Sequence, residues 1–473
     1  MTLTSAPRLD QDILSTGIES LDVILGGGLP RGGVTVVAGS PGSGKTVLAL
    51  ELVFARARRG GRILYITTVS GPSLKLLHYM QRFSFFDAAL ADRAIDFMDV
   101  GEQLLADPNE AQRLITERVS EREPAVVVID SFRAIHELLP RGGAEARAFV
   151  YRLSVSLAAL GATSLFLGAY AESEVTQLPE FAVADGIIRL GNVRRELAMT
   201  RELEVLKLRG LAYYTGAHSF EITADGLAVY PRVRAPEAAS LEVPSGRVPT
   251  GLAGLDDLFG GGVPGHSTTL VHGSTGTGKT LLSLAFLLEG ARRGETGIYF
   301  GLDETPAQLA QLAETVGWDV RSFEDRGLLR LRYTSPVELS TDRYLHEMRS
   351  EVRRAGARRV VLDSFSTMQE SVPSRRRFRE LAYAIAKHMR DADVTLFATV
   401  ELAEILGGAQ LTGHAVSAIA DNVILLRYVE FGGELRKAIS VLKARGVAHK
   451  TDPHSFRVTE NGPGVGVALG QDH

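Results

Sequence analysis

Two glycine-rich segments of this chain share the pattern Gly-x-x-x-x-Gly-Lys-Thr, one at residues 39–46 and the other at residues 273–280. In such a loop, backbone N–H groups point at phosphate oxygens at the start of a helix, the lysine reaches the β- and γ-phosphates, and the threonine hydroxyl binds Mg²⁺. We therefore expect two sites that bind ATP with Mg²⁺. The nucleotide-binding residues expected from the two loops are Gly42, Ser43, Gly44, Lys45 and Thr46, and Thr275, Gly276, Thr277, Gly278, Lys279 and Thr280.

One aspartate in each half of the chain ends a short apolar run. These residues are Asp130, after Val126-Val-Val-Ile, and Asp363, after Val360-Val-Leu. Their spacing from the loops suits an aspartate that holds the water shell of Mg²⁺, although a purely structural carboxylate at a strand end is the alternative. The expected metal-binding residues are Thr46, Asp130, Thr280 and Asp363.

The two halves differ in the carboxylates that follow the next strand. The second half has Asp303 and Glu304, whereas we align Thr67, Thr68 and Val69 with this segment in the first half. A hydroxyl and an isopropyl group cannot accept a proton near neutral pH. We therefore expect the first half to bind ATP and hydrolyse it poorly. As an alternative to a catalytic role, Asp303 and Glu304 would only cap the helix that starts at Pro306.

A Lys-x-Arg motif occurs late in each half, as Lys207 with Arg209 and Lys443 with Arg445. Lysine is rare in this arginine-rich chain, so its repeated use indicates a need for a compact ammonium group. Each motif is expected to bind ATP phosphate, either in its own domain or in a neighbouring subunit. A solvated pair on an edge strand is the alternative. The expected catalytic residues are Asp303, Glu304, Lys279, Asp363, Lys443 and Arg445.

The motifs belong to an internal repeat with an offset of 234 residues, set by Lys45 and Lys279. Each half alternates apolar strands with helices, which is typical of an α/β doubly wound domain. A proline-rich stretch separates the halves and is typical of a linker. We therefore expect an N-terminal ATPase domain at residues 1–235 and a C-terminal ATPase domain at residues 236–473.

The composition is that of a cytoplasmic globular protein, with 45% hydrophobic and 23% charged residues and a net charge of −4. The absence of cysteine excludes disulfides and thiolate chemistry. No signal peptide or membrane span is expected. One hypothesis for the function is a DNA-remodelling motor, which the basic cluster at residues 375–379 supports. The negative charge and 7% aromatic content argue against nucleic acid as a partner.

Taken together, the doubled loop, the lead-in Thr-Gly-x-x-x-Leu-Asp, Asp303-Glu304 and the segment 422–446 resemble the KaiC family of RecA-like ATPases and autokinases in bacterial clock systems. The resemblance implies two tandem RecA-like domains in a double-ring hexamer, with ATP bound between subunits. It places Asp303 and Glu304 on the catalytic pair of the family, and Lys443 and Arg445 at the nucleotide of the adjoining subunit.

The resemblance also places Ser417 on the serine of the phosphoacceptor pair of the family, while Ala418 replaces the threonine, which excludes a two-site phosphorylation cycle. It implies a KaiB-like or other signalling partner, whereas the short C-terminus argues against a KaiA-type partner. A serine autokinase and ATPase outside the oscillator proper is thus our first hypothesis. A nucleotide-gated scaffold with little chemistry is the second.

Overall fold

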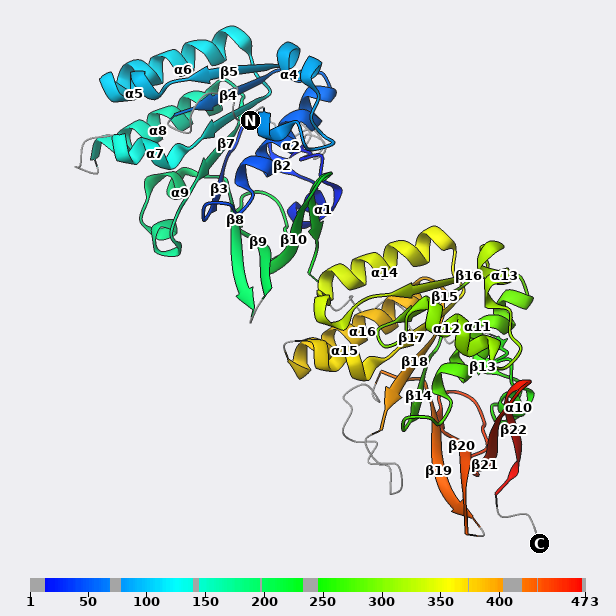
Figure 1. The fold of residues 1–473 in the computed structure, drawn as a ribbon. Helices are drawn as coiled ribbons and strands as arrows, with labels where there is room; N and C mark the ends of the chain where they lie inside the picture. The colour runs from blue at the N-terminus through cyan, green and yellow to red at the C-terminus, as the bar shows by residue number, and fades with distance from the viewer. Residues whose placement is uncertain are drawn as a thin grey trace, which may run out of the picture. The chain divides into compact units, whose positions relative to one another are not determined.

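The computed structural model describes two compact units, which lie within residues 13–232 and 246–469. The described residues are 13–68, 78–138, 144–195, 198–232, 246–372, 374–402, 419–431 and 433–469. Each unit has one mixed nine-stranded sheet with helices on both faces (Figure 1). The expected α/β class with two tandem domains is confirmed.

The sheet of the first unit has the order β11-β10-β9-β8-β3-β7-β6-β4-β5. The six neighbours β8-β3-β7-β6-β4-β5 are parallel, and β9, β10 and β11 extend the sheet in antiparallel pairs. Its strands and the separate pair β1 and β2 are β1 (Ile13–Leu14), β2 (Leu29–Pro30), β3 (Val34–Gly39), β4 (Ile63–Thr67), β5 (Ile95–Asp99), β6 (Val126–Asp130), β7 (Thr163–Gly168), β8 (Gly186–Arg195), β9 (Ala198–Leu208), β10 (Ala217–Thr223) and β11 (Gly226–Tyr230). The helices are α1 (Glu19–Leu25), α2 (Lys45–Arg58), α4 (Ala88–Ala94), α5 (Gly101–Ala106), α6 (Pro108–Arg122), α7 (Phe132–Leu138), α8 (Ala144–Ala159) and α9 (Pro179–Val183).

The sheet of the second unit repeats this topology as β16-β15-β17-β18-β14-β19-β20-β21-β22. Its strands and the pair β12 and β13 are β12 (Arg247–Val248), β13 (Val263–Pro264), β14 (Thr268–Gly273), β15 (Gly297–Gly301), β16 (Leu329–Tyr333), β17 (Arg359–Asp363), β18 (Thr395–Glu401), β19 (Asn422–Phe431), β20 (Glu434–Ala444), β21 (His454–Thr459) and β22 (Gly462–Ala468). The helices are α10 (Ala253–Leu258), α11 (Lys279–Arg292), α12 (Pro306–Glu314), α13 (Val320–Asp325), α14 (Thr341–Ala355), α15 (Phe365–Ser371) and α16 (Arg375–Asp391).

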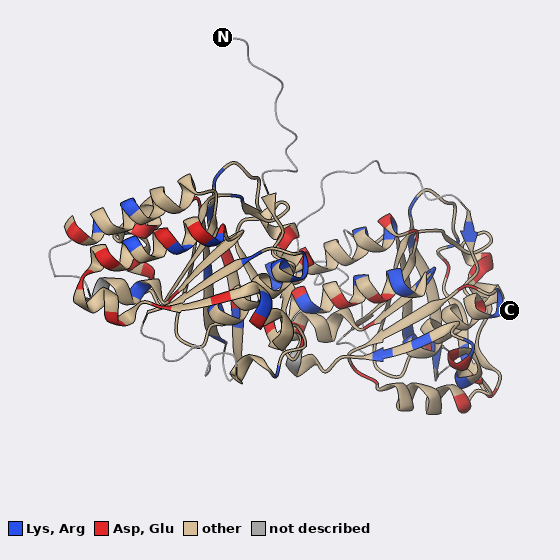
Figure 2. Cartoon of the chain, turned by 90° about the horizontal axis from the view of Figure 1, so that it is seen from above, with Lys and Arg blue, Asp and Glu red and all other residues tan. Residues whose placement is uncertain are grey.

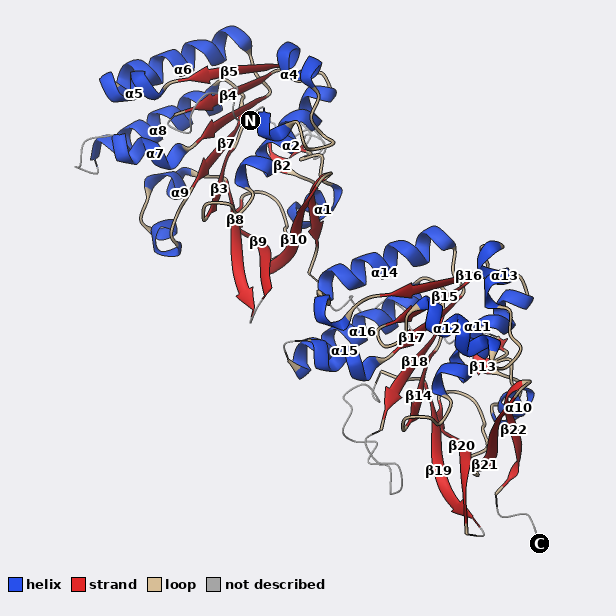
Figure 3. Cartoon of the chain, viewed as in Figure 1, coloured by secondary structure: helices blue, strands red, loops and turns tan. Residues whose placement is uncertain are grey.

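Alternating strand residues build two hydrophobic layers in each unit, as the helices on the two faces of each sheet in Figure 3 indicate. In the second unit, Ile298 and Phe300 pack with α14 to α16, whereas Tyr299 between them packs with α10 to α13. Burial of such side chains stabilises the fold by about 1.5–3 kcal/mol each. This two-sided burial explains why the central strands are apolar at nearly every position.

The parallel order places the loop after β14 between its neighbours β18 and β19. Carboxyl ends of parallel strands share one edge of a sheet, so the ends of β14, β15, β17 and β18 meet there, and ligands of such sheets bind outside that edge. The sequence did not predict the antiparallel extension, which in Figure 1 projects as the long β19–β20 hairpin.

Charged residues of both signs are interspersed along the helices of both units (Figure 2). Arg377 of the basic cluster is directed inward, where its side chain is 19% exposed and pairs with Asp342 and Glu380. This pairing removes one arginine from any nucleic-acid surface.

In the described part of the chain, no helix is long and apolar enough to cross a membrane.

Candidate nucleotide sites

The second phosphate loop joins β14 to α11 and has the backbone that phosphate binding requires. Gly276 and Gly278 adopt positive φ angles of 76° and 106°, a conformation that side chains with a Cβ rarely adopt. Gly278 precedes the first residue of α11, so the free N–H groups of that helix start at the loop. Thr277 Oγ1 stabilises the turn by donating to the Ser274 carbonyl at 2.8 Å.

The loop lysine of each half folds back over its own loop. Lys279 Nζ donates to the carbonyls of Gly273 at 2.8 Å and Ser274 at 3.1 Å. Lys45 Nζ makes the equivalent bonds to Gly39 at 2.8 Å and Ser40 at 2.9 Å. Burial lowers the pKa of both ammonium groups, and nearby carboxylates oppose this shift. The lysines therefore stand at the phosphate position, where a triphosphate would replace the carbonyl acceptors.

The first loop has the same geometry in the remaining predicted residues. Gly42 and Gly44 have φ angles of 74° and 98°, and Gly44 precedes the first residue of α2. The Ser43 hydroxyl is buried and has no hydrogen-bond partner in the described residues. Both loops thus have the shape of a phosphate site, whatever their rates of hydrolysis.

The expected metal-binding pairs lie in contact in both halves. Thr46 Oγ1 donates to Asp130 Oδ2 at 3.0 Å, and Thr280 Oγ1 donates to Asp363 Oδ2 at 3.2 Å. No group of three or more His, Cys, Asp or Glu residues that could hold a metal is found in the described residues. This donor set fits Mg²⁺, which takes one or two protein ligands together with waters and substrate phosphates.

A buried tyrosine orients each of these aspartates. Tyr65 OH donates to Asp130 Oδ2 at 2.9 Å, and Tyr299 OH donates to Asp363 Oδ2. Burial and the adjacent carboxylate raise the tyrosine pKa well above its usual range, so both phenols remain donors. The sequence analysis missed these tyrosines, although the offset of 234 places Tyr65 on Tyr299.

The two carboxylates after β15 occupy different surroundings. Asp303 accepts hydrogen bonds from Ser364 Oγ at 2.9 Å and Thr367 Oγ1 at 2.6 Å, which tie it to the start of α15. Glu304 Oε1 lies 3.5 Å from Thr280 Oγ1, beside the phosphate loop. The cap of α12 is supplied by Thr305, so neither carboxylate serves as the helix cap considered above.

Glu304 has the proton affinity of a general base. Burial, together with the charges of Asp363 and Asp303, raises the pKa of its carboxyl to about 7. A base works best when its pKa lies near the working pH. The two carboxylates therefore differ in their surroundings, with Glu304 beside the phosphate loop and Asp303 bonded to the start of α15.

Strand pairing corrects our alignment of the first half. Thr67 pairs with Asp130 as Gly301 pairs with Asp363, which makes Thr68 equivalent to Leu302. The backbone N–H of Thr68 donates to the Asp130 carbonyl at 3.2 Å, and that of Leu302 donates to the Asp363 carbonyl at 2.7 Å. The positions of Asp303 and Glu304 are thus Val69 and Ser70, both outside the described residues. Neither residue is a carboxylate.

The Lys-x-Arg motifs lie away from the phosphate loops of their own units. Lys443 of β20 pairs with Val423 of β19, next to a bulge. Leu426 of β19 is level with Gly273 at the start of the loop, so Lys443 lies about 10 Å from that level along the strand direction. Its Nζ donates to the Ala420 carbonyl at 2.7 Å, and Arg445 pairs with Asp421 at 3.4 Å. Burial and the neighbouring Arg445 lower the pKa of Lys443.

The first unit repeats this arrangement. Lys207 pairs with Ile187 next to an equivalent bulge, and its Nζ lies 3.5 Å from the carbonyls of Phe181 and Ala182. Arg209 pairs with Asp185 at 3.3 Å. The structure therefore does not bring these four cations to the loop of their own half. Ser417 and Ala418 lie outside the described residues.

A further carboxylate contacts the second loop. Glu401, at the end of β18, accepts a hydrogen bond from Thr275 Oγ1, and its charge opposes the lowering of the Lys279 pKa by burial. Lys437 Nζ donates to the Gly276 carbonyl at 2.7 Å. The sequence offered one sign of this residue, since Glu401 ends an apolar strand as Asp363 does. Its contact with Thr275 could not be predicted, because the two residues are 126 positions apart in the sequence.

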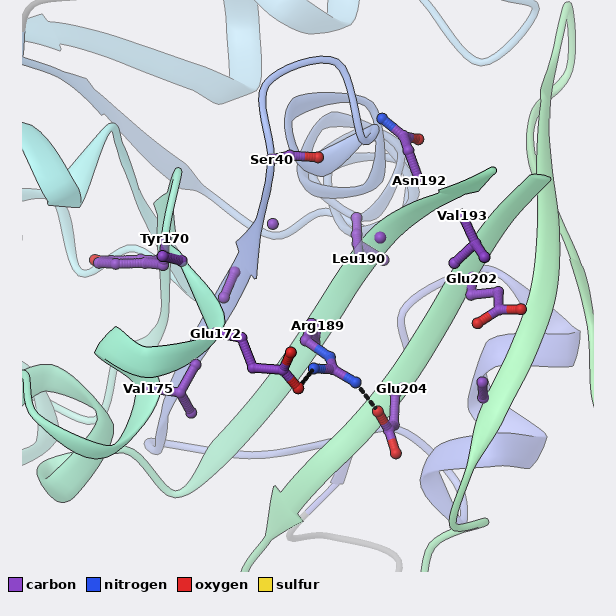
Figure 4. Close-up of a pocket in the computed structure, with 15 residues that line it drawn as sticks. Ser40, Tyr170, Glu172, Val175, Arg189, Leu190, Asn192, Val193, Glu202 and Glu204 are labelled. Carbon is purple, nitrogen blue, oxygen red and sulfur yellow. Dashed lines mark hydrogen bonds and ion pairs between the residues drawn. The ribbon is translucent and has the colours of Figure 1, made fainter. Parts of the chain in front are cut away.

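The first loop instead borders a pocket with fixed charges. Figure 4 shows Arg189 between Glu172 and Glu204, with Ser40 of the loop nearby. Strand pairing places Leu425 and Ser440 at the positions of Arg189 and Glu204 in the second unit. Two carboxylates hold Arg189, so it is not free to neutralise a phosphate.

Known proteins match this sequence along almost its whole length. The family described as "ATPase: KaiC" matches residues 14–234 and again 248–468. "Circadian clock oscillator protein KaiC" from Picosynechococcus sp. is 30% identical over 467 residues, which cover 96% of this chain and 89% of that protein. "Circadian clock protein KaiC3" from Synechocystis sp. is 31% identical over 477 residues, covering 96% and 91%.

Proposed function

Because this chain belongs to the KaiC family of ATPases, we propose that its second domain hydrolyses ATP and transfers phosphate to Ser417, while its first domain binds ATP with little hydrolysis. The observation that carries the proposal is Glu304, a carboxylate with a pKa of about 7 beside the second phosphate loop. The first domain has Ser70 at this position. The output is signalling or timing without a two-site phosphorylation cycle.

In the proposed reaction, the oxygen of a water molecule or of the serine hydroxyl bonds to the γ-phosphorus. Glu304 takes the proton that this oxygen loses. The bond from that phosphorus to the bridging oxygen of ADP breaks, and Lys279 neutralises the charge that develops on the phosphate oxygens. Mg²⁺, held through Thr280 and Asp363, supplies further neutralisation when bound. Burial and the charge of Asp363 raise the pKa of Glu304, and the charge of Asp303 adds to this effect.

The placement of the Lys-x-Arg motifs supports assembly into a ring. Lys443 and Arg445 lie away from the loop of their own unit, which supports a role at the nucleotide of a neighbouring subunit. We propose a hexamer in which Lys207 and Arg209 serve the first ring in the same way. ATP would then stabilise the interface only when it is bound.

Ser417 as phosphoacceptor rests on its position in the sequence. It lies three residues before Ala420, whose carbonyl accepts a hydrogen bond from Lys443. A phosphate with roughly two negative charges close to Lys443 and Arg445 would change the electrostatics of that surface. Phosphorylation at this position could therefore alter the subunit boundary and signal to a KaiB-like or other partner.

The first domain favours a scaffold role for one ring. Its loop geometry is intact, but Val69 and Ser70 cannot act as a base and Arg189 is held by two carboxylates. We propose that ATP in this domain holds subunits together with slow turnover.

Phosphate release by purified protein with Mg·ATP tests the proposal. Glu304→Gln should abolish most of it, and Glu314→Gln, on the exposed side of α12, should not. Activity of Glu304→Gln close to that of the wild type would place hydrolysis in the first domain and refute the assignment.

A further inference from the structure

A cavity of the C-terminal domain lies outside its nucleotide site. It has a volume of about 330 Å³ and lies between the edge strand β16 and helix α14. Phe300, Tyr333 and Thr334 line it from the ends of β15 and β16, and one face of α14 closes it. The volume is within the range of small-molecule sites.

Three arginines at this cavity share one carboxylate. Arg330 Nη1 and Arg332 Nη2 lie 2.9 Å and 2.6 Å from Glu351 Oε1, and Arg354 pairs with its other oxygen. The Glu351 side chain is 8% exposed, whereas those of Arg332 and Arg354 are 46% and 68% exposed. One negative charge cannot balance three positive ones, and Glu347, the other carboxylate that lines the cavity, already pairs with Arg343. The cluster therefore keeps an excess of positive charge, and Arg332 and Arg354 are accessible.

The repeat provides an internal control for the role of the arginines in folding. Pairing of β4 with β5 and of β15 with β16 places Asp96 and Met98 at the positions of Arg330 and Arg332. The first domain forms the same strand and the equivalent helix α6 without cations on the strand. In that domain Asp96 of the strand pairs with Arg118 and Arg122 of α6, so the charges are reversed and the fold does not require arginines on the strand.

We propose that the cavity between β16 and α14 is an accessory binding site for a small phosphate-bearing anion. Arg332 and Arg354 would bind phosphate oxygens, since planar guanidinium groups match phosphate geometry. The ring of Tyr333, which is 43% exposed, offers a face for the rest of the ligand. The site does not depend on the hydrolysis proposed above.

Isothermal titration calorimetry with inorganic pyrophosphate tests the site. The full chain is first saturated with Mg·AMP-PNP, so that both phosphate loops are filled. We expect one pyrophosphate to bind per chain, and a double variant Arg332→Ala with Arg354→Ala to bind about a hundredfold more weakly, at about tenfold for each charged contact.

Arg353→Ala, on the same helix but not lining the cavity, is the matched control and should keep the affinity of the wild type. Thermal unfolding of each variant checks that it folds, and the exposure of Arg332 and Arg354 makes large destabilisation unexpected. A parallel titration with malonate distinguishes phosphate from carboxylate ligands. The proposal is overturned if pyrophosphate does not bind, if the double variant binds it unchanged, or if malonate binds as tightly.

Discussion

Replacement of Glu304 by Gln removes the proposed general base and keeps the size of the side chain. General-base assistance contributes about 10²–10⁴ in rate, or about 2.7–5.4 kcal/mol of activation free energy. ATP binding should persist, because Lys279 keeps its contacts with the loop and Thr280 keeps its contact with Asp363 when Glu304 alone is changed. Phosphate release should therefore fall by at least about a hundredfold with little change in nucleotide affinity.

The pH dependence gives a second test of the same residue. With a pKa of about 7, Glu304 is about one-tenth ionised at pH 6 and about nine-tenths at pH 8, so the rate should rise across this window. Asp303→Asn removes a negative charge that raises this pKa, and the rising limb should move to lower pH. A rate that is flat between pH 6 and 8 would refute the role of Glu304, as would a limb that stays in place in Asp303→Asn.

Three further outcomes are expected. Light scattering should show assembly on addition of Mg·ATP that Lys45→Ala weakens; an unchanged mass would contradict a shared nucleotide. Lys443→Ala should lose hydrolysis, which should recover on mixing with Glu304→Gln subunits that supply Lys443 in trans; no recovery would place Lys443 outside the neighbouring site. Mass spectrometry after incubation with ATP should find phosphate on Ser417 and none in Ser417→Ala; phosphate elsewhere, or none during active hydrolysis, would leave an ATPase without this autokinase activity.

Local motifs made the family and the fold class predictable. The phosphate loops and the repeat offset are contiguous patterns, so Lys45 and Lys279 could be identified without tertiary information, and the resemblance to KaiC is confirmed by the family match. The antiparallel extension was not predicted, because alternation in β20 and β21 does not reveal which strand each one pairs with.

Site residues that depend on long-range pairing were missed. Tyr299 reaches Asp363 across 64 residues, and Glu401 reaches Thr275 across 126. The one-residue error at Thr68 has a different origin, since the offset of 234 already places Val69 on Asp303, and pairing of the strands with β6 and β17 agrees with that register. The separate surroundings of Asp303 and Glu304 also required the fold, because adjacent residues in the sequence give no indication of which one faces the loop.

Division of labour between the two domains can be measured directly in a chain whose second loop is disabled. Lys279→Ala protein is incubated with Mg·ATP, freed of unbound nucleotide, denatured, and its bound nucleotides are separated by chromatography. We predict one ATP per chain, retained unhydrolysed in the first domain, while the wild type also contains ADP from the second. ADP as the main nucleotide of Lys279→Ala would show that the first domain hydrolyses ATP without a carboxylate at Val69 or Ser70, and would contradict the central claim.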